Sequence, residues 1–153
     1  MKILYFDIDG TVISIDRGEA KSNLRDGALE RAVRHAGFTH LVCVGNIGIV
    51  ASEVESLGVE YDAIGVVFKL CDSAFVDESW FRSVTRMIAD PANRAHYIDY
   101  SSNWWYLDDL AASYLQKADR LEELRELVCD RVFMPNPRGN GLGVIDWLKA
   151  IPV

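Results

Sequence analysis

The chain has 153 residues, half of them hydrophobic and a quarter charged, with a net charge of −7 at pH 7. Such a chain is long enough for one ordinary domain with a full hydrophobic core, so we expect a single domain over residues 1–153. The acidic balance argues against a nucleic-acid surface, which would carry a basic stripe. It leaves anionic small substrates open, because a bound divalent cation reverses the local field.

No charged and apolar leader opens the sequence, and no apolar run approaches ~18 residues. We therefore expect neither a signal peptide nor a membrane span, and a cytoplasmic location. Cys43, Cys71 and Cys129 lack CxxC spacing, which favours buried free thiols in a reducing compartment over a zinc site.

The first eleven residues are the most informative stretch. A hydrophobic run through Phe6 leads into Asp7-Ile8-Asp9-Gly10-Thr11. A continuous apolar run that ends in a glycine turn is typical of a strand buried on both faces, usually a parallel one. The two-residue period of a strand then sends both carboxylates to one side. They are metal ligands, an acid–base pair or a nucleophile with its proton shuttle, unless they are ordinary turn residues.

Short apolar runs and amphipathic segments alternate along the rest of the chain. The runs predict strands at residues 1–6, 40–44, 64–68, 104–107 and 131–134. The amphipathic segments predict helices at residues 26–37, 50–58, 77–90, 110–118, 119–128 and 144–150. Residues 12–25 are expected to form a loop or small hairpin, and Tyr97-Ile98 either an extra short strand or an extended loop. The alternation indicates a three-layer α/β/α sandwich with a mainly parallel, five-stranded, Rossmann-like sheet.

A second pair of acids, Asp108-Asp109, follows the predicted strand at residues 104–107. Ligands of open parallel sheets bind at the carboxyl ends of the strands, so both acid pairs are expected at one edge. Acids gathered there repel one another unless a cation lies between them. A hard divalent ion with oxygen ligands, most simply Mg²⁺, would satisfy them. Alternatively, one acid caps the helix that begins near Leu110.

These two stretches resemble motifs I and IV of the haloacid dehalogenase-like (HAD) superfamily of aspartyl-phosphate hydrolases. The resemblance covers the whole chain through its strand order. It implies that Asp7 attacks the phosphorus of a phosphate ester, and that Asp9 protonates the leaving group and then activates water. Thr11 matches the residue that supports the nucleophile loop. Mg²⁺ would be held by Asp7, the main-chain carbonyl of Asp9 and Asp108, with Asp109 as a direct or indirect helper.

The second motif of that family departs from the pattern. The family ends its second strand in Ser or Thr, which binds the phosphate, whereas this chain has Val44-Gly45-Asn46. Main-chain amides at Gly45, the side chain of Asn46 and the loop at Gly10 and Thr11 would then bind the phosphate. A plain strand-to-helix turn explains Gly45-Asn46 equally well.

The third motif supplies a Lys or Arg that neutralises the transferred phosphate. Lys69, at the end of the predicted third strand, is the preferred match, with Arg82, Arg86 and Arg94 as competitors.

The intervals where this family inserts a cap, residues 12–25 and 69–103, are too short or too irregular for a large one. A capless or minimal-cap form is therefore expected, with an open site suited to macromolecular substrates or closed by another subunit. Three tryptophans are candidates to line that opening, although core packing is expected for at least two of them: Trp80, Trp104 and Trp105.

The sequence thus predicts an Mg²⁺-dependent phosphatase that acts on a phosphorylated small molecule or macromolecule, with homo-oligomerisation left open. The alternative is a catalytically weakened relative that serves as a metal- and phosphate-binding or regulatory module. A receiver-like domain is a third reading, but Asp72 is poorly placed to be its phosphorylated residue.

Overall fold

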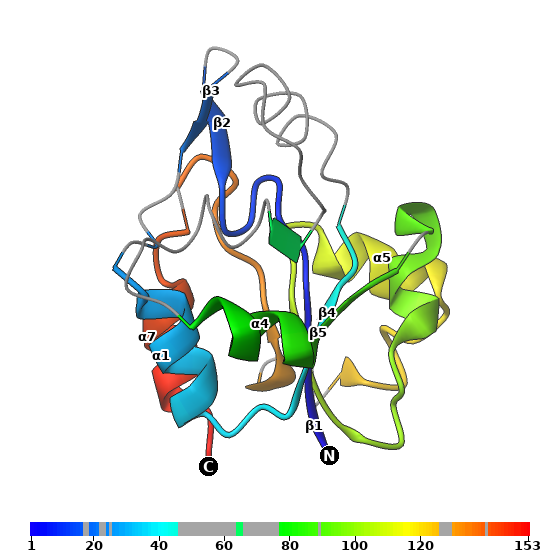
Figure 1. Ribbon diagram of the computed structural model, residues 1–153. Coiled ribbons are helices and arrows are strands. Elements are labelled where there is room, and N and C mark those ends of the chain that lie inside the picture. Colours follow the sequence, from blue (N-terminus) through cyan, green and yellow to red (C-terminus); the bar gives the residue numbers. More distant parts are fainter. Residues whose placement is uncertain are drawn as a thin grey trace.

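A computed structural model shows five parallel strands in one sheet, in the order β5-β4-β1-β6-β7 (Figure 1). The structure describes residues 1–16, 19–21, 24, 26–45, 64–65, 77–88, 90–125, 130–139 and 141–153. The strands are β1 (Lys2–Phe6), β4 (His40–Cys43), β5 (Thr85–Met87), β6 (Asn103–Leu107) and β7 (Val132–Phe133). The strand order reverses direction between β1 and β6. In open parallel sheets this switch point is where ligands bind, beyond the carboxyl ends of the strands.

Helices cover both faces of the sheet, which gives the three-layer α/β/α sandwich that the sequence predicts. One face carries α1 (Ala28–His35), α4 (Glu78–Val84) and α7 (Val144–Ala150). The other carries the 3₁₀ helix η1 (Pro91–Tyr97) and α5 (Ala111–Lys117). A small hairpin of β2 (Ser14–Asp16) and β3 (Glu19–Lys21) extends beyond the carboxyl edge of the sheet, and both chain ends lie at the opposite edge (Figure 1).

Strand β1 explains why the opening run is apolar throughout. Leu4 and Phe6 pack into the cluster beneath α1, α4 and α7, whereas Ile3 and Tyr5 pack into the cluster beneath η1 and α5. All four side chains are at most 5% exposed. Burial of a large apolar side chain contributes about 1.5–3 kcal/mol, so both faces of this central strand stabilise the sandwich.

The predicted third strand is wrong where the structure describes it. Ile64 and Gly65 are helical, and residues 66–68 lie outside the described part of the chain. The place beside β4 belongs to β5, which pairs Leu41 with Thr85 and Cys43 with Met87. The sequence pattern placed those β5 residues in a helix, but α4 ends at Val84 and the chain continues directly into the strand.

Most other predicted elements are confirmed, with small changes in their bounds. The hairpin forms within residues 12–25, and the closing helix spans residues 144–150. Pro91 begins η1 rather than ending a longer helix, and residues 121–124 form turns where a helix was expected. The predicted helix at residues 50–58 lies outside the described residues.

Within the described part of the chain, every helix is too short or too polar to cross a membrane.

Candidate acidic site

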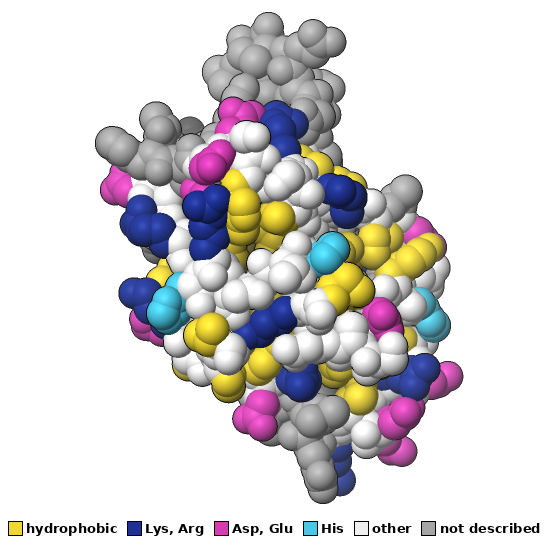
Figure 2. Space-filling model, turned by 60° about the horizontal axis from the view of Figure 1, so that its bottom comes forward, with side chains coloured by type: hydrophobic (Ala, Val, Ile, Leu, Met, Phe, Trp, Pro, Cys, Tyr) yellow, Lys and Arg dark blue, Asp and Glu magenta, His cyan; other side chains and the backbone are white. Residues whose placement is uncertain are grey.

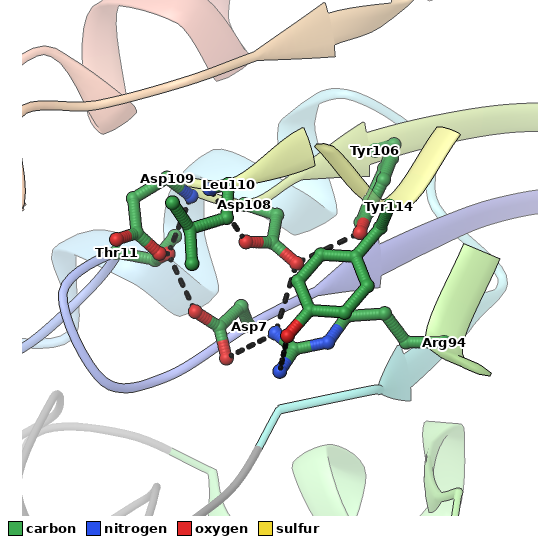
Figure 3. Close-up of polar contacts among 8 residues, drawn as sticks. All are labelled: Asp7, Thr11, Arg94, Tyr106, Asp108, Asp109, Leu110 and Tyr114. Atoms are coloured by element: carbon green, nitrogen blue, oxygen red, sulfur yellow. Dashed lines mark hydrogen bonds and ion pairs between the residues drawn. The ribbon is translucent and has the colours of Figure 1, made fainter. Parts of the chain in front are cut away.

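Asp7 and Asp108 leave neighbouring strands at the switch point of the sheet and turn toward each other (Figure 3). Asp7 follows β1, and its amide donates to the carbonyl of Leu107 at 2.8 Å. Asp108 follows β6, and its amide donates to the carbonyl of Phe133 at 3.1 Å. The parallel ladder therefore continues one residue past each strand, which fixes both acids at the carboxyl edge. Their side chains are almost fully buried.

Thr11 joins the two acidic segments. Its hydroxyl lies 3.0 Å from Asp7 Oδ2 and 3.1 Å from Asp109 Oδ1, and it accepts a hydrogen bond from the Asp109 amide at 3.0 Å. The turn that brings Thr11 back over Asp7 passes through Gly10 at φ +79°, where a Cβ atom would lie 2.8 Å from Asp109 Oδ2. Glycine is required there on both counts, since other residues rarely adopt that φ and the space is filled.

A guanidinium group occupies the space between the two buried acids (Figure 3). Arg94 Nη1 lies 3.0 Å from Asp7 Oδ1 and 3.0 Å from Asp108 Oδ2. The guanidinium stacks 4.0 Å from the centre of the Tyr114 ring and donates to its hydroxyl. Arg94 is 7% exposed, so this is a desolvated ion pair whose partners need one another.

Asp108 accepts more hydrogen bonds from the protein than Asp7 does. Oδ1 accepts from the Leu110 amide at 2.9 Å, and Oδ2 accepts from the Tyr106 hydroxyl at 2.7 Å as well as from Arg94. The alternative prediction, that Asp108 or Asp109 is the N-cap of the following helix, is wrong: the N-cap residue of α5 is Leu110, and α5 has no side-chain cap bond. Three donors favour the ionised form of the Asp108 side chain.

Burial, and secondly the charge of Asp108, raises the pKa of Asp7 to about 8 against the opposing effect of Arg94. Burial also raises the pKa of Asp108. One guanidinium balances one carboxylate, so the second acid must hold a proton or gain another cation. Asp7 has fewer donors than Asp108, which favours the protonated form of Asp7 over that of Asp108.

Asp9 lies at the start of the turn, and its Oδ1 is buried without a donor among the described residues. Burial, followed by the charge of Asp109, raises the pKa of Asp9 to about 6. An acid of that strength keeps an appreciable protonated fraction near neutrality, which suits a general acid.

Gly45 is the described residue of the predicted second motif, and it packs directly behind Asp7. A Cβ atom at position 45 would lie 2.0 Å from Asp7 Oδ1 and 2.8 Å from the Ile8 amide nitrogen. A serine or threonine is therefore excluded at this position by Asp7 itself.

The donor set suits a hard divalent cation. Carboxylate oxygens of Asp7, Asp108 and Asp109 all lie within 4.8 Å of one another. Oxygen ligands of one octahedral Mg²⁺ lie about 2.9 Å apart when adjacent and about 4.2 Å apart when opposite, so these oxygens would have to move closer together to hold the ion.

The structure brings together six of the residues that the sequence singles out: Asp7, Gly10, Thr11, Gly45, Asp108 and Asp109. It adds Arg94, which the sequence ranked below Lys69. Pro91 gave the missed signal, because proline is favoured in the first turn of a helix and so marks the start of the element that carries Arg94.

Other predicted residues do not reach this site or lie outside the described residues. Arg82 pairs with Glu78, and Arg86 bonds to main-chain carbonyls of α4. Trp104 and Trp105 are buried in the two cores, and Trp80 packs against Arg34, so core packing is confirmed for the first two. The remaining three are not described: Asn46, Lys69 and Asp72.

The fold and site define an α/β Rossmann-like sandwich with a buried acidic centre at its switch point. Comparison of the chain with models of known protein families, with curated proteins and with solved structures found no match. The functional proposal therefore rests on the residues and their geometry.

Proposed function

We propose that this protein is an Mg²⁺-dependent phosphatase that hydrolyses a phosphate monoester through an aspartyl-phosphate on Asp7, in the manner of HAD-like hydrolases. The convergence of Asp7, Asp108 and Asp109 at the switch point carries the proposal. Two motifs 98 residues apart meet through Thr11, as a shared active site requires. The placement of Arg94 adds the cation that phosphoryl transfer needs.

Asp7, Asp108 and Asp109 would hold the metal, together with the main-chain carbonyl of Asp9. When bound, Mg²⁺ supplies positive charge that lets an anionic nucleophile approach an anionic phosphate.

The protein's own residues then divide the reaction into two displacements. A carboxylate oxygen of Asp7 bonds to phosphorus while the bond from phosphorus to the leaving oxygen breaks, and Asp9 gives its proton to that oxygen. Water next attacks the phosphorus, the bond to Asp7 breaks, and the Asp9 carboxylate takes a proton from the water. Thr11 holds the second oxygen of Asp7 in place throughout.

Arg94 is proposed to fill the role that the sequence gave to Lys69. Its Nη1 contacts the Oδ1 atom of Asp7, so the positive charge sits beside the oxygen atoms among which the phosphoryl group would be transferred. Because Tyr114 stacks on the guanidinium, the orientation of the side chain is fixed before substrate arrives.

Hydrolysis of p-nitrophenyl phosphate tests the proposal. We expect turnover with Mg²⁺, loss of turnover with EDTA, and a fall of roughly 10³-fold or more in Asp7→Asn, because the nucleophile is removed. Asp146→Asn is the matched control, since Asp146 is an exposed acid on α7. Absence of metal-dependent turnover by the wild type across a broad panel of phosphate esters would contradict the phosphatase.

Gly45 favours a second candidate, a metal- and phosphate-binding module that does not turn over. The contact between Gly45 and Asp7 leaves no room for the hydroxyl that the family uses to bind phosphate. This candidate predicts heats of Mg²⁺ and phosphate binding by calorimetry, lost in Asp108→Asn, without hydrolysis. A titration that gives no metal-dependent heat rejects it.

A further inference from the structure

The amino edge of the sheet, opposite the acidic site, holds a cleft of about 720 Å³. This volume lies within the range of small-molecule sites. Residues from the starts of β1 and β6, the approach to β7 and the end of α7 line it, among them Lys2, Asn103, Trp105, Arg131, Trp147 and Pro152. Lys2 and Asp7 are five residues apart along an extended chain, roughly 17 Å, so the cleft and the acidic site are separate.

Two cations in this cleft share one indole ring. Lys2 Nζ lies 5.8 Å from the centre of the Trp105 ring, and the Arg131 guanidinium lies 5.0 Å from it. Lys2 also lies over Phe38, and Arg131 over Trp104. Aromatic contacts position both cations but neutralise neither charge.

Neither cation forms an ion pair with a described residue, although the chain as a whole is acidic. Lys2 donates to the carbonyls of Ala36 and Pro152, and Arg131 Nη1 donates to Asn103 Oδ1 and the Trp104 carbonyl. Asp130 lines the cleft but pairs with neither cation. Burial, and secondly the charge of Arg131, lowers the pKa of Lys2. Among the described residues, the contacts of these two cations are with neutral oxygen atoms and ring faces.

Apolar surface adjoins these cations. Trp147 stacks on Phe133 and lines the cleft together with Ala150 and Ile151. Figure 2, which turns this end of the molecule forward, shows Lys and Arg side chains set among hydrophobic ones. A ligand that fits both features carries a negative group on an apolar body.

We propose that this cleft binds a small ligand that bears a carboxylate or phosphate group on an apolar body, with the anion held by Arg131, while the buried Lys2 adds positive charge to the cleft. Arg131 offers the planar donor group that suits either anion. The inference is independent of the phosphatase proposal, because it involves none of the residues of the acidic site.

Binding of three matched probes tests this cleft: 1-naphthoate, naphthalene-1-phosphonate and the neutral 1-naphthamide. Calorimetry on the full chain is run with EDTA, so that the acidic site stays negative and repels the anions. We expect at least one anion to bind about tenfold or more tightly than the amide, as a charge-assisted hydrogen bond provides. Tighter binding of the naphthoate assigns a carboxylate ligand, and tighter binding of the phosphonate assigns a phosphate ester.

Arg131→Gln should remove most of this preference for the anion, and Arg31→Gln, which removes an exposed charge on α1, should leave it unchanged. The proposal is overturned if no anion binds, if the amide binds as tightly as the anions, or if both variants lose affinity equally. If Arg131→Gln does not fold, the salt dependence of binding to the wild-type protein tests the proposal instead. Raising ionic strength from about 0.05 to about 0.5 M must weaken anion binding and spare the amide.

Discussion

The Asp7 carboxylate fills the space that a side chain at position 45 would occupy, and it can do so because residue 45 is glycine. Asp7 Oδ1 lies 2.0 Å from the point where a Cβ atom of residue 45 would be placed. The same oxygen is the one that contacts Arg94. The missing Cβ therefore permits the ion pair that holds the proposed nucleophile in place.

Replacing Gly45 with Ala should destabilise the protein by about 1–3 kcal/mol, since the methyl group overpacks a filled site. Chemical denaturation of four proteins measures this in a double-mutant cycle: wild type, Gly45→Ala, Asp7→Ala and the double variant. We expect a smaller penalty for Gly45→Ala when Asp7 is already shortened. Equal penalties in both backgrounds would contradict the steric contact with the Asp7 side chain.

At the scale of single residues, the acids of this site are predictable and its cation is not. Asp7 and Asp108 directly follow apolar runs, and parallel strands bring the residues after their carboxyl ends to one edge. A cation between these acids is also predicted from the sequence, as a bound metal ion. Arg94 reaches that position from η1, and where η1 packs depends on tertiary contacts that no local pattern encodes.

At the scale of elements, α4 and β5 show that apolar residues at helical spacing can run from a helix into a strand. Asp77 caps the start of α4, because its Oδ1 accepts from the Trp80 amide at 3.0 Å. Phe81, Val84 and Met87 keep helical spacing, yet the chain turns extended at Thr85. The Thr85 hydroxyl donates to the Phe81 carbonyl at 2.6 Å and so satisfies one open end of the helix. The spacing of apolar residues alone does not indicate where this helix ends.

Helix η1 matters because it carries Arg94, so its contribution can be measured by Arg94→Met. Loss of the guanidinium leaves Asp7 and Asp108 facing each other in a buried space. We expect destabilisation of about 3–5 kcal/mol at pH 8, because the variant buries both acids without the cation that pairs with them. Arg82→Met, which breaks the surface pair with Glu78, should cost no more than about 1 kcal/mol.

Denaturation midpoints with and without Mg²⁺ add a second measurement on Arg94→Met. If the metal site is as proposed, Mg²⁺ should stabilise this variant more than the wild type, because it restores the missing positive charge. An Arg94→Met protein as stable as Arg82→Met would show that the buried ion pair does not support the fold.

At the scale of the whole molecule, the sandwich separates two charged regions. The carboxyl edge gathers Asp7, Asp108 and Asp109, the first two paired with Arg94, and at the amino edge Lys2 and Arg131 lie against Trp105. Strands β1 and β6 contribute residues to both edges. Because the two strands are central and buried on both faces, they hold the residues of both edges in place. The charges at the two edges do not contact each other.

The acidic edge should give the metal-free protein an unusual dependence of stability on pH. The pKa of Asp7 is raised from 3.8 to about 8, and that of Asp9 from 3.8 to about 6. Between those limits the unfolded chain has released protons that the folded chain retains. The free energy of unfolding therefore falls as pH rises from about 4 to about 8, and it levels off above that.

Urea denaturation in EDTA at intervals of pH measures this slope, and Asp7→Asn isolates its main source. Between pH 6 and 8 the retained proton is that of Asp7, with a slope of at most about 1.4 kcal/mol per pH unit. Asp7→Asn lacks the ionisable group, so its stability should vary less over the same interval, and the difference between the two curves cancels the titration of other groups. A difference curve that is flat, or that rises with pH, would mean that Arg94 keeps Asp7 ionised in the folded protein. Asp7 would then be ready to act as a nucleophile without first losing a proton.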